Sequence, residues 1–382
     1  MKSLNKKILY VVNVDWFFIS HRLPIATQAV SKGFEVHVAC RITSHGDLLK
    51  SYGLHVHSLE IPRSKISPIS FLRTFIEMCN LFKLIKPDLV HLITIKPVLL
   101  GGIASRYCKV PAVVSAISGL GYIYISSGVY AKIRRFFTSF LYKAALSHKN
   151  MTVIFQNSND LQEVTKISGL LKENTLMIKG SGVVISDFSN YLYEQEHKKN
   201  PIILMASRIL ADKGVYEFIR SAKIVKKNFS NSRFILAGML DEENPTGISS
   251  REIHSFVENG LIEYFGHVSD IAQLLQKSYL VVLPSYREGM PKILLEAAAA
   301  GRAVITTNVP GCRDSIIHNE TGLLVEPKNH KSLSNAILFL LESPEKTQEM
   351  GLAGRKLAEK NFNVDKVITQ HLNCYKDLLQ IN

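Results

Sequence analysis

The sequence has few of the features that mark a secreted, metal-bound or membrane-spanning protein. Its 382 residues include five widely separated cysteines, with no Cys-x-x-Cys pair and no His/Cys cluster at zinc-ligand spacing. We therefore expect reduced thiols and no structural metal. No run of about 18 apolar residues occurs, so no membrane span is predicted. The apolar stretch near the N-terminus ends at Asp15, and we interpret it as a first buried strand rather than a signal peptide.

Common cofactor motifs are also missing. The residues after the first predicted strand read NVDWFFISHRLP, without the G-x-G-x-x-G of dinucleotide-binding oxidoreductases, and no G-x-x-x-x-G-K-[ST] phosphate loop occurs. No Asp-x-Asp pair is present either, so we expect no bound cofactor and no metal requirement. These absences weigh against dehydrogenases and P-loop enzymes.

Acidic residues are scarce only in the first half of the chain. Residues 1–190 hold 23 Lys/Arg against 10 Asp/Glu, a net charge of +13, whereas residues 191–382 hold 23 against 22. A one-sided positive field favours either nucleic acid or an anionic membrane surface, unless the excess lysines serve solubility alone. No nucleic-acid recognition motif is present, so we expect no nucleic-acid partner. We predict a cytoplasmic protein that is peripheral on the cytoplasmic face of the inner membrane.

Two segments mix apolar and cationic residues as membrane-surface helices do. The first is residues 129–149. The second is residues 67–86. Either segment could instead be a core helix with snorkelling lysines, and for the second the two explanations fit equally well. The membrane contacts predicted in the first segment are Lys132, Arg134, Arg135, Phe136 and Phe137.

Short β-branched runs alternate with helix-length segments along the whole chain, and the pattern restarts after a polar, linker-like stretch at 193–201. Such alternation predicts parallel sheets covered by helices on both faces. We expect two doubly wound α/β domains, with ligands bound at the carboxyl ends of the strands, in a cleft between the domains. The expected strands are 7–14, 35–40, 54–61, 88–93, 112–117 and 152–156, then 202–207, 233–238, 262–266, 279–285, 303–307 and 322–327.

The stretch SYREGMPKILLEAAAAG, residues 285–301, carries two glutamates eight positions apart. Pro291 suits the first position of a helix, whose free N–H groups and positive dipole end favour phosphate. Glu296 lies roughly 7.5 Å further along the axis, about the step from a phosphate to its ribose, and a carboxylate matches vicinal hydroxyls. Glu288 would reach another part of the same ligand. Glu296 could instead face solvent, but its apolar neighbours favour burial.

A second phosphate-directed pair lies in MASRILADKGV, residues 205–215. Arg208 and Lys213 occupy a strand-to-helix loop, where they can clamp a diphosphate, one as a planar fork and the other as a point charge. Arg and Lys are common in exposed loops, so this pair alone is a weak indication of a phosphate site. Together with Glu288 and Glu296 it becomes specific.

These motifs have a familiar combination: SR-x4-KG at 207–214, EG-x-P-x4-EA at 288–297 and NVPGCRDSIIHNETGLLVEP at 308–327. Residues 201–327 resemble the nucleotide-sugar-binding domain of the family 4 retaining glycosyltransferases. The resemblance implies the GT-B fold, in which two Rossmann-like domains face each other across a cleft. The domains we expect are an acceptor-binding, membrane-facing one at 1–190, a donor-binding one at 191–363, and a C-terminal helix at 364–382 that crosses back to the first.

The resemblance also implies roles for single residues. Arg208 and Lys213 would bind the donor diphosphate, Glu288 a hydroxyl of the donor sugar, and Glu296 the ribose hydroxyls. We take the first three as the catalytic set. The backbone close to the donor would be that of Gly289, Met290 and Pro291.

The first domain resembles the family less closely. Many members have a Gly-Gly loop where this chain has WFFISHRLPIA, which is similar to a branch that acts on lipid-linked sugars in bacterial surface-polysaccharide assembly. His21 and Arg22 would start a helix there and contact donor phosphate or acceptor, unless His21 is a capping or packing residue. Many members have a His after the fifth strand, about where Ser118 stands here, so no histidine role carries over. We group Ser118 with His21 and Arg22 as a contact for donor phosphate or acceptor.

The prediction is transfer of a hexose or N-acetylhexosamine from a UDP-sugar to a polyprenyl-diphosphate-linked saccharide in O-antigen or capsule synthesis, with retention of configuration. The expected partners are the nucleotide-sugar donor, the lipid-linked acceptor and an anionic membrane surface. The glutamates would bind hydroxyls rather than attack carbon, which leaves front-face attack by the acceptor. A GT-B relative, such as a nucleotide-sugar epimerase or a phosphorylase, is the alternative, and a nucleic-acid-binding protein is a further one.

Overall fold

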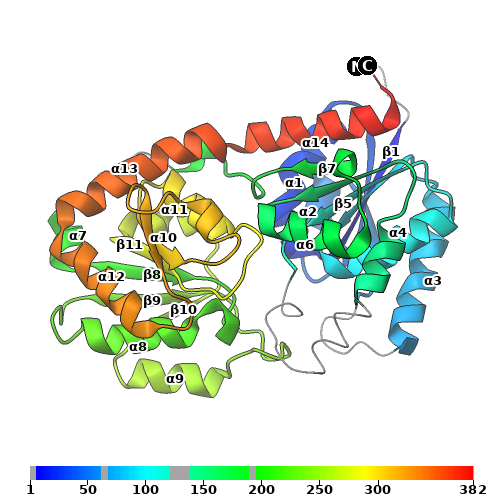
Figure 1. Ribbon diagram of the computed structural model, residues 1–382. Helices are drawn as coiled ribbons and strands as arrows, with labels where there is room; N and C mark the ends of the chain where they lie inside the picture. Colours follow the sequence, from blue (N-terminus) through cyan, green and yellow to red (C-terminus); the bar gives the residue numbers. More distant parts are fainter. Residues whose placement is uncertain (1–5, 62–67, 121–137, 189–194, 382) are drawn as a thin grey trace. The chain divides into compact units, whose positions relative to one another are not determined.

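A computed structural model describes residues 6–61, 68–120, 138–188 and 195–381 (Figure 1). The chain divides into two compact units, Met1–Ser181 with Val364–Asn382, and Gly182–Asn363. Each unit contains one all-parallel sheet with helices packed on it. The predicted α/β class with two doubly wound sheets is confirmed.

The sheet of the first unit has the strand order β3-β2-β1-β4-β5-β6-β7. Both of its faces are buried, because alternate residues of β1 enter two different cores: Leu9 and Val11 lie in one, Ile8 and Tyr10 in the other. The strands are β1 (Lys7–Val14), β2 (Glu35–Arg41), β3 (His55–Ser58), β4 (Leu89–Ile93), β5 (Ala112–Ile117), β6 (Met151–Phe155) and β7 (Thr175–Met177). The helices are α1 (Asp15–Ser31), α2 (Gly46–Ser51), α3 (Pro68–Ile85), α4 (Ile95–Tyr107), α6 (Ser158–Ser168) and α14 (Val364–Leu379), with a further helical stretch at 138–145.

The C-terminal helix α14 belongs to the first unit, although it follows the second in sequence. It lies beside α1 (Figure 1). Its Tyr375 hydroxyl is 2.7 Å from Nδ1 of His91 on β4 and 3.1 Å from the Tyr10 hydroxyl on β1. These buried contacts tie the end of the chain to the centre of the first sheet.

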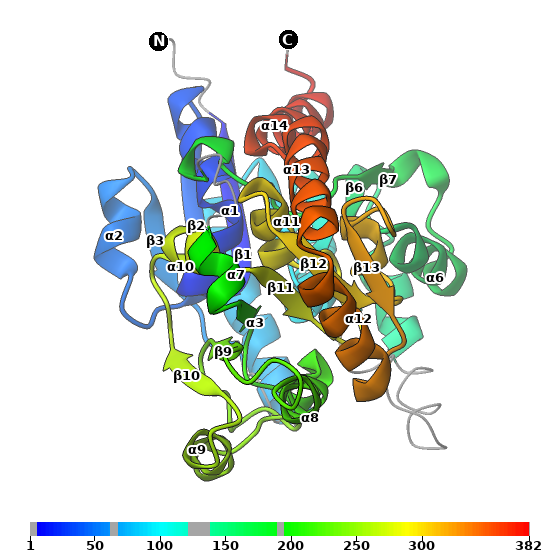
Figure 2. The ribbon, with the colours of Figure 1, turned by 90° about the vertical axis from the view of Figure 1, so that its left-hand side faces the viewer.

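The sheet of the second unit has the order β10-β9-β8-β11-β12-β13. Helices α8 and α12 lie side by side on it (Figure 2). The strands are β8 (Ile202–Ala206), β9 (Arg233–Ala237), β10 (Glu263–Gly266), β11 (Leu280–Leu283), β12 (Ala303–Thr307) and β13 (Gly322–Val325). The helices are α7 (Gln195–Lys199), α8 (Val215–Val225), α9 (Ser250–Glu258), α10 (Ile271–Lys277), α11 (Lys292–Ala299), α12 (His330–Glu342) and α13 (Pro344–Asn361).

The stretch at 193–201 is not the featureless linker that its polar sequence predicts. Helix α7 forms there, and Nε2 of His197 lies 2.9 Å from the carbonyl oxygen of Gln276 in the second unit. The division between the units falls earlier, at Ser181 and Gly182. Within the described ranges, none of the helices has the length and apolar character that crossing a bilayer requires.

Candidate active site

Two loops of the second unit meet at the carboxyl ends of the neighbouring parallel strands β8 and β11. One loop joins β8 to α8, and the other joins β11 to α11. The amide of Tyr286 donates to the carbonyl of Asp212 at 2.9 Å. Gly214 has φ +81°, and a Cβ there would lie 2.2 Å from the carbonyl oxygen of Pro284. Only glycine allows the two loops to approach this closely.

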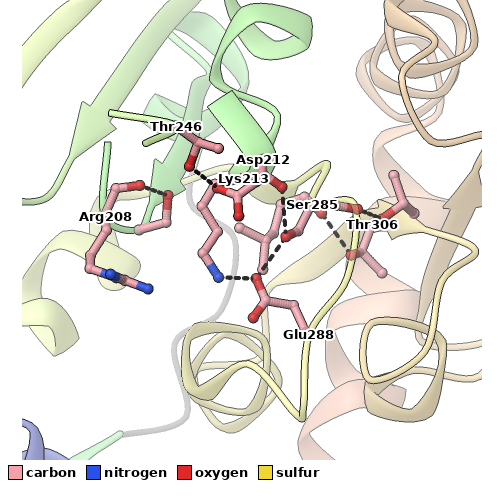
Figure 3. Close-up of polar contacts among 10 residues, drawn as sticks. Arg208, Asp212, Lys213, Thr246, Ser285, Glu288 and Thr306 are labelled. Carbon is pink, nitrogen blue, oxygen red and sulfur yellow. Dashed lines mark hydrogen bonds and ion pairs between the residues drawn. The ribbon is translucent and has the colours of Figure 1, made fainter. Parts of the chain in front are cut away.

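Lys213 and Glu288 form an ion pair between these loops (Figure 3). Nζ of Lys213 lies 2.5 Å from Oε1 of Glu288, and the side chains are only 17% and 13% exposed. The Ser285 hydroxyl donates to the same oxygen at 2.7 Å. Because an ammonium group has three N–H donors, Lys213 can keep this contact and still bind a ligand oxygen.

Arg208 makes an ion pair of its own, with Nη1 3.1 Å from Oδ2 of Asp241. Asp241 lies in the loop after β9, the strand next to β8, and is not among the site residues predicted from the sequence. The feature of the sequence that could have revealed it is a carboxylate a few residues after the predicted strand 233–238. The Arg208 side chain is 46% exposed, and such pairs contribute about 0–1 kcal/mol, so little energy opposes its turning toward an anionic ligand.

A third loop, after β12, supports the backbone of Glu288. The amide of Glu288 donates to the carbonyl of Pro310 at 3.2 Å. Gly311 has φ +80°, and a Cβ there would lie 2.4 Å from the carbonyl oxygen of Glu288. Cys312 is fully buried; burial first, and then the nearby Glu288 charge, raise the pKa of its thiol to about 12. Residues 310–312 (Pro-Gly-Cys) thus form a packing surface against the loop between β11 and α11 that carries Glu288.

Helix α11 begins one residue later than predicted. Pro291 has ψ 122° and is the N-cap, so Lys292 takes the first helical position. Gly289 and Met290 lie in the loop just before this cap. Glu296 is 8% exposed, which excludes the solvent-facing alternative. Burial raises the pKa of its carboxyl, and Lys292, with Nζ 3.1 Å from Oε1, offsets this only in part.

A further contact missed from the sequence anchors the loop between β11 and α11. The Tyr286 hydroxyl lies 3.0 Å from both carboxylate oxygens of Glu217, a buried residue of α8. Nζ of Lys328 lies 5.0 Å from the centre of the Tyr286 ring. Burial first, and then the Glu217 charge, raise the pKa of Tyr286. This contact holds the loop between β11 and α11 against α8.

The chain matches known proteins over both units. Residues 192–357 match the family described as Glycosyl transferases group 1, and residues 7–157 match Glycosyl transferase 4-like. The N,N'-diacetylbacillosaminyl-diphospho-undecaprenol alpha-1,3-N-acetylgalactosaminyltransferase of Campylobacter jejuni is 32% identical over 343 residues, 85% of this chain and 89% of that protein. The chain therefore belongs to the glycosyltransferase family of this relative, in which a 4-like domain precedes a group 1 domain.

Other comparisons agree. The capsular polysaccharide biosynthesis glycosyltransferase CapM of Staphylococcus aureus is 28% identical over 396 residues, 98% of each protein. The structure of WaaG, a glycosyltransferase involved in lipopolysaccharide biosynthesis, has a TM-score of 0.75 at 16% identity and covers 95% of this chain, while this chain covers 99% of that one. The predicted GT-B fold of this glycosyltransferase is confirmed.

In the first unit of the glycosyltransferase, His21 and Arg22 do not start a helix. Helix α1 begins at Asp15, directly after β1, so this prediction is wrong. The buried Asp15 carboxylate accepts hydrogen bonds at 2.7 Å from both the amide and the hydroxyl of Thr43. Burial would raise the pKa of Asp15, but these bonds outweigh it and lower the pKa. They hold the first turn of α1 at Asp15, ahead of the predicted helix start at His21.

Arg22 and Ser118 come together in this unit. Arg22 is 1% exposed; it donates to the carbonyl of His21 at 2.9 Å and reaches Oγ of Ser118, after β5, at 3.5 Å. Its Nε has no hydrogen-bond partner among the described residues. Burial lowers the pKa of Arg22. The ring of His21 stacks on that of Phe17 at 4.1 Å between centroids, which agrees with a packing role.

The predicted membrane contacts cannot be placed on the fold, because the segment that carries them lies outside the described residues. They are Lys132, Arg134, Arg135, Phe136 and Phe137.

Proposed function

We propose that this glycosyltransferase moves a hexose or N-acetylhexosamine from a UDP-sugar to a polyprenyl-diphosphate-linked saccharide at an anionic membrane surface, and that it retains the anomeric configuration. The C. jejuni relative is named for an undecaprenyl-diphosphate-linked acceptor, and the S. aureus relative for capsular polysaccharide. The observation that carries the proposal is the Lys213–Glu288 contact. It joins a cation suited to phosphate and a carboxylate suited to sugar hydroxyls at the carboxyl ends of two neighbouring strands.

The site residues of the second unit each have a role in this reaction. Arg208 and Lys213, with the positive dipole end of α11, stabilise the charge that builds up on the departing diphosphate. Glu288 accepts a hydrogen bond from a hydroxyl of the donor sugar, and Ser285 holds it in place. Glu296 accepts the two ribose hydroxyls, which restore the hydrogen bonds that its burial removes.

The chemistry at the sugar exchanges one bond for another. The bond from the anomeric carbon to the diphosphate oxygen breaks, and a bond to the acceptor oxygen forms on the same face. The acceptor proton passes to an oxygen of the departing diphosphate. Neither glutamate becomes covalently attached.

Donor binding tests the site. UDP-, GDP- and ADP-sugars are titrated against the wild type, Arg208→Ala and Arg233→Ala. Arg233 is the matched control. Its side chain is 44% exposed at the start of β9, away from the loops, and it pairs with Glu263 at the start of β10. Arg208→Ala is expected to weaken donor binding about tenfold, and Arg233→Ala to leave it unchanged. Equal affinities for both variants would remove Arg208 from the site.

Turnover tests the reaction. Donor and a polyprenyl-diphosphate-linked saccharide are expected to give a glycosylated lipid whose new linkage keeps the donor's anomeric configuration by NMR. When the donor is incubated without acceptor, its sugar is expected to keep its stereochemistry. Epimerisation without acceptor would instead favour the epimerase alternative.

A further inference from the structure

Helix α3 exposes a row of large apolar side chains on one side. Ile69, Leu72, Ile76 and Leu84 are 80%, 58%, 49% and 78% exposed. Their spacing places them within one arc of the helix, opposite the side that packs into the core of the first unit. Core packing therefore accounts for only the inner side of α3, and the outer row needs another partner.

Tyr107, at the end of the neighbouring helix α4, extends this row. It is 67% exposed, its ring lies 6.2 Å from that of Phe75 on α3, and Nζ of Lys83 lies 5.6 Å from its centre. Glu77, the acidic residue of α3, already pairs with Arg73 at 3.0 Å. Exposed cations of α3, of the end of α4 and of the residues that follow each helix are Arg73, Lys83, Lys86, Arg106 and Lys109. A tyrosine and cations beside aliphatic side chains are typical of a surface that lies at a lipid–water boundary.

The direction of α3 decides which edge of the sheet the exposed apolar row lies nearest. The helix follows β3 and precedes β4, two strands of one parallel sheet, so it runs antiparallel to them. Its first turns, with Ile69 and Leu72, therefore lie toward the carboxyl edge of the sheet, and Lys83 toward the other edge. Ligands of such sheets bind at the carboxyl edge. The most apolar part of the row is thus nearest the edge that an acceptor would use.

We propose that the α3 face, formed by Ile69, Leu72, Ile76, Leu84 and Tyr107, docks this protein on an anionic bilayer. The aliphatic side chains enter the headgroup region, and the surrounding cations stay among lipid phosphates. The charge of +13 in residues 1–190 complements such a surface. This inference rests on the proposed function, because a polyprenyl-linked acceptor resides in a bilayer.

Vesicle co-sedimentation of the full chain, without donor or acceptor, tests the α3 face. The vesicles are phosphatidylcholine alone or mixed with phosphatidylglycerol. The double variant Leu72→Gln/Ile76→Gln is expected to lower partitioning onto the mixed vesicles about tenfold or more. Its control, Phe339→Gln/Leu352→Gln, changes apolar side chains of the second unit that are 47% and 40% exposed, and should bind as the wild type does.

Three results would overturn the inference: wild-type protein that does not prefer the mixed vesicles, equal loss in the two double variants, or a wild-type dimer in analytical ultracentrifugation that the Leu72/Ile76 variant dissociates. The last result would assign the face to a second copy of the chain. Added salt is expected to weaken binding, since it screens the cations.

A soluble acceptor separates this inference from the proposed function. With a short-chain diphosphate-linked saccharide, the Leu72→Gln/Ile76→Gln variant is expected to keep the wild-type kcat/KM, and to lose turnover only on acceptor embedded in vesicles. Loss on both acceptors would make the face a structural element and refute docking. If the wild type transfers to neither acceptor, the proposed function fails, while vesicle binding still decides the α3 face.

Discussion

Gly311→Ala tests how strictly the site depends on the packing of its loops. An added Cβ would lie 2.4 Å from the carbonyl oxygen of Glu288 and 2.5 Å from that of Gly289, whereas ordinary contact begins at 3.4 Å. The backbone of Glu288 must therefore retreat by about 1 Å, because close-packed interiors have no slack to absorb the methyl group. A displacement of about 1 Å costs roughly 100-fold in rate. We expect kcat/KM to fall by about that factor.

Gly260→Ala is the matched control for this change. Gly260 also has a positive φ, +67°, but a Cβ there would meet no atom within 4 Å. Both variants carry the cost of a left-handed alanine, about 1–2 kcal/mol, and only Gly311→Ala adds a clash, worth about 1–3 kcal/mol. Urea unfolding measures these costs, and initial rates under conditions where each variant stays folded measure activity. If the two variants turn over donor equally fast, the idea that Gly311 positions Glu288 is refuted.

Two more predictions follow from buried titratable groups. Glu296→Gln keeps the shape of the side chain but removes its charge, so calorimetry should show donor affinity about tenfold weaker. Because burial raises the pKa of Glu296, wild-type affinity should also fall on acidification, and a pH-independent wild type would count against the ribose role. Burial first, and then the Arg22 charge, lower the pKa of His371 from 6.5 to about 3. The unfolded chain then takes up that proton first, so the free energy of unfolding should fall by up to about 1.4 kcal/mol per pH unit below pH 6.5. In His371→Leu, urea midpoints should show a shallower dependence, and an unchanged slope would contradict the assignment.

The fold class, and most of the residues that the second unit gathers at the candidate site, could be predicted from the sequence alone. A strand buried on both faces of a parallel sheet has to be apolar along its length, so runs such as Ile202–Ala206 are visible without a structure. Glycines that permit close approach, such as Gly214, sit in local motifs for the same steric reason. The burial of Glu296 followed from its apolar neighbours.

Tertiary structure decided which of these residues touch. Asp241 reaches Arg208, and Gly311 supports Glu288, because β9 and β12 are the neighbours of β8 and β11, and strand order is set by long-range pairing that no local pattern encodes. The start of α1 depends on the hydrogen bonds between Asp15 and a distant loop, and the short edge strand β7 on pairing with β6. Local physics sets what each segment can become, whereas contacts between distant segments select its partners.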